Sequence, residues 1–150
     1  MRIVIQRVSE AGVSVKGKSV AEIEKGLLIF LGIEDCDAET DADWLVAKLS
    51  SLRIFSDDAG LMNCSVQEAG GSMMVVSQFT LHAKTRKGSR PSFIKAARPE
   101  KAIPLYEYFV DQLRAVSGVK VSTGEFGAMM NVSLVNDGPV TILIDSQNRE

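Results

Sequence analysis

Hydrophobic and polar positions alternate or cluster along the chain in short blocks, which is typical of a β-rich protein with a few helices. The blocks that have the length and composition of strands are residues 3–8, 13–16, 19–23, 26–33, 73–79, 119–123, 130–135 and 140–144. Turns are expected at Ala11-Gly12 and at Lys16-Gly17-Lys18. The run 26–33 is continuously apolar, which predicts a strand buried on both faces.

Two segments instead show helical spacing. The first carries one apolar stripe: Ala38, Ala42, Leu45, Leu49 and Leu52. Thr40 and Asp43 are the expected capping pair of this helix. The second helix is predicted to begin at about Pro104 and to end at Gly118. Its expected inner side is Leu105, Tyr108, Phe109, Gln112, Leu113 and Val116. Many strands with two main helices predict an α+β fold, and the tight turns predict largely antiparallel sheets in a single domain of residues 1–150.

Composition narrows the classes of function. Cys36 and Cys64 form no CxxC motif, and His82 is the only histidine, so we expect no metal and no cofactor. No apolar run is long enough for a membrane span, and the first residues form a strand rather than an export signal. We therefore expect a cytoplasmic protein with no membrane partner.

Charge is distributed unevenly. The chain has 17 basic and 19 acidic residues, yet the segment 84–101 holds only one acidic residue, Glu100. Its seven basic residues are Lys84, Arg86, Lys87, Arg90, Lys95, Arg98 and Lys101. Such a segment is either a solvated basic loop or a face that binds phosphate groups, and the charge alone does not decide between them.

Two polar segments lie at the ends of apolar strands. Ser77-Gln78-Phe79-Thr80-Leu81 follows a buried strand, where its polar groups could simply cap the turn or could line a site. Asn136-Asp137-Gly138-Pro139 lies between two apolar runs and has the composition of a hairpin turn. Neither segment is specific when taken alone.

Taken together and in order, the motifs resemble the D-aminoacyl-tRNA deacylase family over nearly the whole chain. The matching segments are Gln6-Arg7-Val8, Ser77 to Leu81, Gly88 to Phe93, Phe126-Gly127-Ala128 with Met130, and Ser133 to Thr141. His82 and Lys84 stand at positions where members of that family vary or carry an acid, and Met129 stands where many of them carry a charged residue.

This resemblance implies a compact β-rich homodimer with an active site at each side of the subunit interface. Gly138-Pro139 would be a cis unit that enters the partner's pocket, and Arg7 would help to hold it. Ser77, Gln78, Phe79 and Thr80 would form the opposite wall. Met130 would contact the terminal adenosine of tRNA, with Phe126 beside it. With RNA as the substrate, Lys84, Arg86, Lys87 and Arg90 become the expected phosphate-binding residues.

The expected reaction is hydrolysis of the ester in D-aminoacyl-tRNA. No Ser-His-Asp set is visible. With the family resemblance, our hypothesis is that the backbone N–H groups of Phe79 and Thr80 bind the oxyanion and that Thr80 is not an obligatory nucleophile. The 2′-hydroxyl of the terminal ribose would help to activate water. A backbone obstacle at Gly138-Pro139 would reject L-aminoacyl groups and would leave glycyl-tRNA accepted. The alternatives are a non-catalytic RNA-binding module and an esterase for small D-amino acid derivatives.

Overall fold

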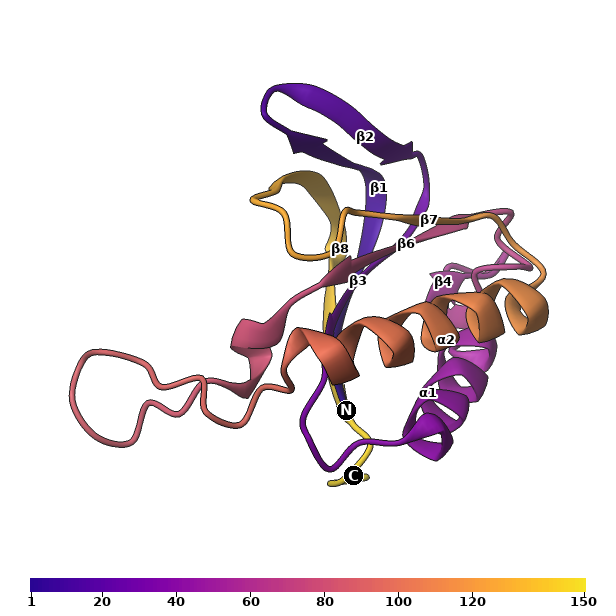
Figure 1. The fold of residues 1–150 in the computed structure, drawn as a ribbon. Coiled ribbons are helices and arrows are strands. Elements are labelled where there is room, and N and C mark those ends of the chain that lie inside the picture. The colour runs from indigo at the N-terminus through magenta and orange to yellow at the C-terminus, as the bar shows by residue number, and fades with distance from the viewer.

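The computed structural model, which describes residues 1–150, contains a six-stranded mixed sheet and two helices (Figure 1). The strands are β1 (Arg2–Val15), β2 (Lys18–Ile23), β3 (Gly26–Gly32), β4 (Phe55–Ser56), β5 (Met62–Cys64), β6 (Ser72–Ser77), β7 (Val121–Thr123) and β8 (Asn131–Asp145). The helices are α1 (Glu39–Ser51), the short 3-10 helix η1 (Phe79–His82) and α2 (Pro99–Ser117). The α+β class with two main helices is thereby confirmed.

Strand β1 organises the sheet because it pairs with three other strands. Its first half pairs antiparallel with β3 and its second half with β2, while β8 follows its opposite edge. The predicted turn at Ala11-Gly12 is wrong, since Gly12 lies within the ladder opposite Glu22 and Ser133. Glycine indicated a break there, but the pairing on both edges holds the segment extended.

Strands β3, β6 and β7 form the parallel part of the sheet. Antiparallel pairings outnumber the parallel ones, since β1 pairs antiparallel with three strands and β4 pairs antiparallel with β5 in a small separate sheet. Strand β3 is buried on both faces as its apolar run predicts. On one face it meets the larger core, with α1 and α2; on the other, Leu28 joins a smaller cluster with Val8, Met74 and Val76.

The helices differ from the prediction mainly at their ends. In α1 the N-cap residue is Ala38, whose N–H donates to the Asp41 carboxylate at 2.9 Å, so the proposed Thr40 and Asp43 pair is wrong. Helix α2 begins at Pro99 rather than near Pro104, because the proline of its first turn is Pro99.

The inner side of α2 also needs correction. It is formed by Ala102, Leu105, Tyr106, Phe109, Val110 and Leu113. Tyr106 therefore points inward where Tyr108 was predicted, and Val116 is exposed. Gly118 ends the helix as predicted, with a left-handed φ of 67° that suits glycine. Neither helix is long and apolar enough to cross a membrane.

The C-terminal segment is not the predicted hairpin. Residues 131–136 and 141–145 both pair with β1, as one strand β8. Asn136 is opposite Val8 and Thr141 is opposite Gln6, so residues 137–140 bulge out of the ladder against the single residue Arg7.

Candidate active site at the end of β6

An apolar pocket of about 370 Å³ opens where β3 and β6 end. Such a volume lies within the range of small-molecule sites. Four parts of the chain line it: the ends of β3 and β6, the start of α2, the loop before β8, and β8 itself. The lining residues are Leu31, Ile33, Val76, Ser77, Gln78, Phe79, Ala97, Ala102, Phe126, Gly127, Ala128, Met129, Met130 and Val132. The structure thus brings together Ser77, Gln78, Phe79, Phe126 and Met130.

One wall of the pocket is the turn from β6 into η1. Gln78 N–H donates to Leu31 O at 2.8 Å, which ties the turn to the end of β3. The next two backbone N–H groups, of Phe79 and Thr80, have no acceptor within the protein because they begin the short helix. They are therefore available to bind a negatively charged oxygen.

The Thr80 side chain is already engaged. Its Oγ1 accepts a hydrogen bond from Gln78 Nε2 at 2.5 Å. The Phe79 ring is half exposed and meets Phe93 edge-to-face, with 5.1 Å between centroids. Thr80 does not line the pocket, whereas Ser77, Gln78 and Phe79 of the same turn do.

The opposite wall rests on a buried tyrosine. The Tyr106 ring packs against Phe126 at 5.3 Å between centroids, and its hydroxyl donates to Val75 O at 3.0 Å. Burial raises the pKa of Tyr106 to about 12. The hydroxyl is consequently a fixed, neutral support behind the pocket at ordinary pH.

The Gly138-Pro139 segment forms an exposed projection elsewhere on the chain. The peptide bond is cis, and Gly138 has a φ of 122° that favours glycine. Arg7 Nε lies 3.3 Å from Asp137 O and 3.2 Å from its carboxylate. Asn136 Nδ2 braces the same projection through hydrogen bonds to Arg7 O at 2.9 Å and Val140 O at 3.0 Å.

This projection does not line the pocket of its own chain. Val132, which does line it, lies six residues before Gly138 on the extended strand β8. At a rise of about 3.3 Å per residue, the two are roughly 20 Å apart. Within one chain, the two predicted halves of the site are therefore separate.

The basic residues Lys84, Arg86, Lys87 and Arg90 are all exposed on the long loop that projects away from the sheet (Figure 1). A backbone pair between Lys84 and Ser92 closes the base of this loop beside the pocket. The charged tip of the loop is therefore exposed, and its base follows η1, whose first residue Phe79 lines the pocket.

Some lining and bracing residues were missed by the sequence analysis. Leu31 and Ala97 gave only an apolar signal, and Met129 was noted only as a variable position. Asn136 belonged to a motif but was assigned to a turn. Its side-chain hydrogen bonds depend on the bulge in β8, which the local pattern did not predict.

Similarity to known proteins agrees with this geometry. Residues 4–145 match the D-Tyr-tRNA(Tyr) deacylase family. The D-aminoacyl-tRNA deacylases of Flavobacterium johnsoniae and Akkermansia muciniphila are each 59% identical to the chain over 150 residues, with both chains fully covered. The solved structure of a c-Myc DNA unwinding element binding protein superposes with a TM-score of 0.90 at 37% identity, covering 97% of this chain and 98% of the other. A probable eukaryotic D-amino acid tRNA deacylase shares the fold, with a TM-score of 0.81 at 19% identity over 95% and 97% of the two chains. The chain belongs to the D-Tyr-tRNA(Tyr) deacylase family.

Proposed function

We propose that the protein hydrolyses the ester bond of D-aminoacyl-tRNA and releases the free D-amino acid and tRNA. The observation that carries this proposal is the pair of unpaired N–H groups at Phe79 and Thr80, at the edge of an apolar pocket of suitable size. The names of the full-length relatives supply the substrate class. Acting on aminoacyl-tRNA, the protein works as a single-domain enzyme in the cytoplasm.

The direct test compares matched D- and L-tyrosyl-tRNA. The purified protein should release D-tyrosine much faster than L-tyrosine from the same tRNA. RNA binding without turnover would favour a non-catalytic RNA-binding module. Equal activity on a free D-tyrosine ester would favour a small-molecule esterase.

The chemistry assigned to the site is oxyanion stabilisation. An aminoacyl ester is already reactive, so positioned N–H donors and a positioned water can supply the catalysis. Thr80 Oγ1 is bonded to Gln78, and the only histidine is buried beside Glu34, so no imidazole activates this hydroxyl. We assign the activation of water to the vicinal 2′-hydroxyl of the substrate.

One change in the enzyme and one change in the tRNA test that assignment. Thr80→Ala should retain most of the activity, and trapping of an acyl-Thr80 ester would refute the mechanism. A tRNA that ends in 2′-deoxyadenosine should be cleaved slowly although it binds normally.

A complete site requires a second copy of the chain. The Gly138-Pro139 projection is exposed and lies too far along β8 to reach its own pocket. Strand β8 also presents Val135 and Leu143, which are 49% and 61% exposed, on a sheet edge with no partner strand. A homodimer in which each projection enters the partner's pocket covers these residues and joins the two halves of the site.

Mixed dimers test this arrangement. Ala128→Trp should block the pocket but leave the projection intact, whereas Pro139→Glu should disable the projection but leave the pocket intact. Each variant alone should be nearly inactive. Because half of randomly mixed dimers are heterodimers with one intact composite site, mixing should restore about a quarter of the wild-type activity. If mixing restores nothing, the projection does not act in trans.

Chiral discrimination is assigned to the backbone of Gly138 and Pro139. A preference of about 10⁴ for the D form requires roughly 5.5 kcal/mol. Side-chain fit in an apolar pocket supplies only about 1–3 kcal/mol. A rigid backbone obstacle near Cα could exclude an L side chain and admit D side chains of different sizes. Glycyl-tRNA has no side chain to exclude, so complete resistance of glycyl-tRNA would contradict this assignment.

The exposed basic loop is assigned to the phosphates of the tRNA acceptor end. Affinity should therefore fall with salt, with a slope near −0.7 per phosphate contact for a single strand. Arg86→Glu and Lys87→Glu should each reduce this slope. An unchanged salt dependence would remove these residues from the RNA-binding surface.

A further inference from the structure

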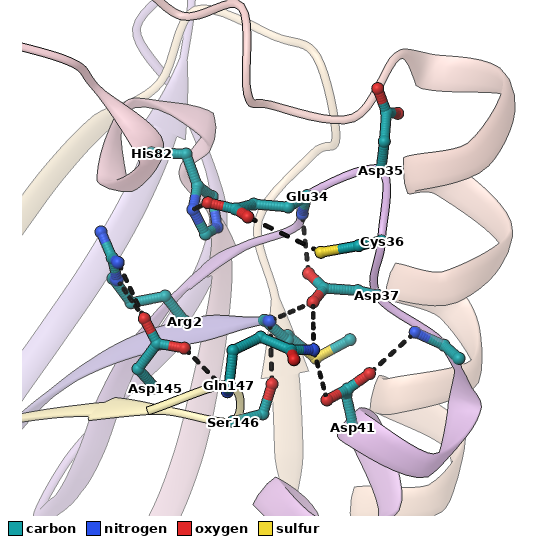
Figure 2. A network of polar contacts seen from close by, with 12 residues as sticks. Arg2, Glu34, Asp35, Cys36, Asp37, Asp41, His82, Asp145, Ser146 and Gln147 are labelled. Atoms are coloured by element: carbon teal, nitrogen blue, oxygen red, sulfur yellow. Dashed lines mark hydrogen bonds and ion pairs between the residues drawn. The ribbon is translucent and has the colours of Figure 1, made fainter. Parts of the chain in front are cut away.

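The single histidine occupies an unusual place at the end of η1. His82 is only 2% exposed, and its Nδ1 lies 2.7 Å from Glu34 Oε1 (Figure 2). Neither ring nitrogen has a partner in hydrogen-bonding geometry, so the contact with Glu34 is a close electrostatic approach rather than an aligned hydrogen bond. A polar ring is buried here without the bonds that usually accompany burial.

Glycine at the end of β3 provides the space for this ring. A Cβ atom on Gly32 would lie 3.0 Å from His82 Cδ2 and Nε2, and also 3.0 Å from Gln78 O. The end of β3 and the turn that contains η1 are therefore in direct contact. A small shift of the ring would shift the turn with it.

Glu34 connects this turn to the base of the basic loop. Its backbone forms an isolated bridge with Ala96, and Lys95 Nζ lies 3.8 Å from the same Oε1 that faces His82. The neighbouring Ala97 N–H donates to Ile33 O at 2.9 Å. One carboxylate thus faces both the catalytic turn and the returning arm of the loop.

The main chain of the turn is also bonded on both sides of His82. Gln78 N–H is bonded to Leu31 O, and Arg2 Nη1 donates to Leu81 O at 2.7 Å. His82 is the only side chain of η1 that contacts an ion-pair partner on a neighbouring segment. After His82, the Ala83 N–H donates to Thr80 O at 3.1 Å and Lys84 pairs with Ser92, so His82 adds a side-chain contact to a turn whose backbone is already bonded.

We propose that His82 and Glu34 are positioning residues for the deacylation reaction, a role that rests on the proposed function of the site. Their contact fixes η1 so that the Phe79 and Thr80 N–H groups point to the position where the oxyanion forms. Neither residue lines the pocket, so they act through the backbone of η1 and not on the substrate. Misplacement of a catalytic group by about 1 Å can cost roughly a hundredfold in rate.

Three variants separate the contact from simple packing. His82→Leu fills the space without a polar atom to face the carboxylate. His82→Asn keeps an N–H donor at the position next to Cγ, where Nδ1 stood. Glu34→Gln removes the negative charge from the less buried partner and retains its size, which keeps the test available if His82→Leu folds poorly.

The activity measurement is single-turnover cleavage of D-tyrosyl-tRNA with the enzyme in excess, together with the Kd for uncharged tRNA. His82→Leu and Glu34→Gln should lower the cleavage rate constant by about tenfold to a hundredfold, with an unchanged Kd for tRNA. His82→Asn should restore the rate to within about threefold of the wild type. Tyr108→Phe is the matched control, because it removes an exposed bond of 2.9 Å to Asp43 between α1 and α2, and it should leave both quantities unchanged.

A measurement on the free protein makes the inference independent of turnover. Hydrogen exchange should accelerate in His82→Leu at the bonded amides of Leu81 and Ala83, but not in the Tyr108→Phe control. If the wild type does not cleave D-tyrosyl-tRNA, the proposed function fails, whereas the exchange result still tests the positioning. Wild-type exchange and rate in His82→Leu, or an equal loss in His82→Asn, would overturn the role of the contact.

Discussion

Asp37 is expected to be one of the most important single side chains for stability. Its carboxylate is fully buried and forms an ion pair with the equally buried α-ammonium group of Met1. It also accepts the Glu34 N–H at 2.7 Å and approaches Gln147 Nε2 at 3.4 Å. Ser146 Oγ accepts a second bond from the ammonium group at 2.9 Å, so the network joins both ends of the chain (Figure 2).

The substitution Asp37→Asn keeps the shape of the side chain and removes its charge. The ammonium group then remains buried without its direct ion-pair partner, a situation that costs about 3–5 kcal/mol in comparable buried pairs. The total stability of a domain is about 5–15 kcal/mol, so this loss is a large part of it. At about 2–4 °C per kcal/mol for a chain of this size, Tm should fall by roughly 6–20 °C.

Urea denaturation monitored by Trp44 fluorescence provides the measurement. Wild type and variant should be compared at one protein concentration, because association would also change the apparent stability. The midpoint should fall with an unchanged m value, which indicates a change in stability rather than in the denatured state. Asp35→Asn is the control, since Asp35 is two residues away and exposed. If the free energy of unfolding of Asp37→Asn lies within about 0.5 kcal/mol of that of Asp35→Asn, the change is no larger than that of an ordinary surface substitution. That result would refute the argument that the ion pair is effectively desolvated.

The remaining predictions concern the pocket wall, pH and a helix end. Burial raises the pKa of Tyr106 to about 12, so the neutral hydroxyl favours the folded state. This contribution to stability should be complete below pH ~10 and should be lost as the pH rises towards 12. In alkaline unfolding curves, Tyr106→Phe should abolish this loss. Gly32→Ala should push the Gln78 turn and lower the cleavage rate more than the tRNA affinity, and an unchanged rate would contradict the close contact at 3.0 Å. Gly118→Ala should reduce the free energy of unfolding by about 1 kcal/mol because the residue has a φ of 67°.

Much of the framework could be predicted from residue patterns because those patterns reflect burial directly. The run 26–33 is apolar on both sides, and β3 is indeed buried on both faces. The stripe through Ala42, Leu45 and Leu49 also forms the buried side of α1. The burial of such positions can be predicted from the local sequence alone.

The errors occurred where the local pattern has two structural solutions. Two apolar runs around Asn136-Asp137-Gly138-Pro139 can pair with each other as a hairpin or can both pair with a third strand. In the structure both pair with β1, and the turn-like residues form a bulge instead. Similarly, two prolines could occupy the first turn of α2, and the choice of Pro104 placed the helix start five residues too late.

The candidate site required more than local patterns. Ser77 and Phe126 are distant in sequence, and only the ordered set of motifs suggested that they belong together. In the structure both residues line the same pocket. The contact between His82 and Glu34 gave no signal, because a lone histidine and a lone glutamate have no characteristic spacing. The network around Asp37 was missed for the same reason.

The closed base of the basic loop has a consequence for the RNA-binding role that we propose for this loop. Lys84 and Ser92 pair through their backbones, and the residues between them make no further backbone hydrogen bond to the rest of the chain. The tip can therefore change in length and sequence without altering the backbone bonds of η1 on the other side of the closure. Replacing the tip with that of a relative would then alter the preference among tRNAs and leave the hydrolytic reaction unchanged.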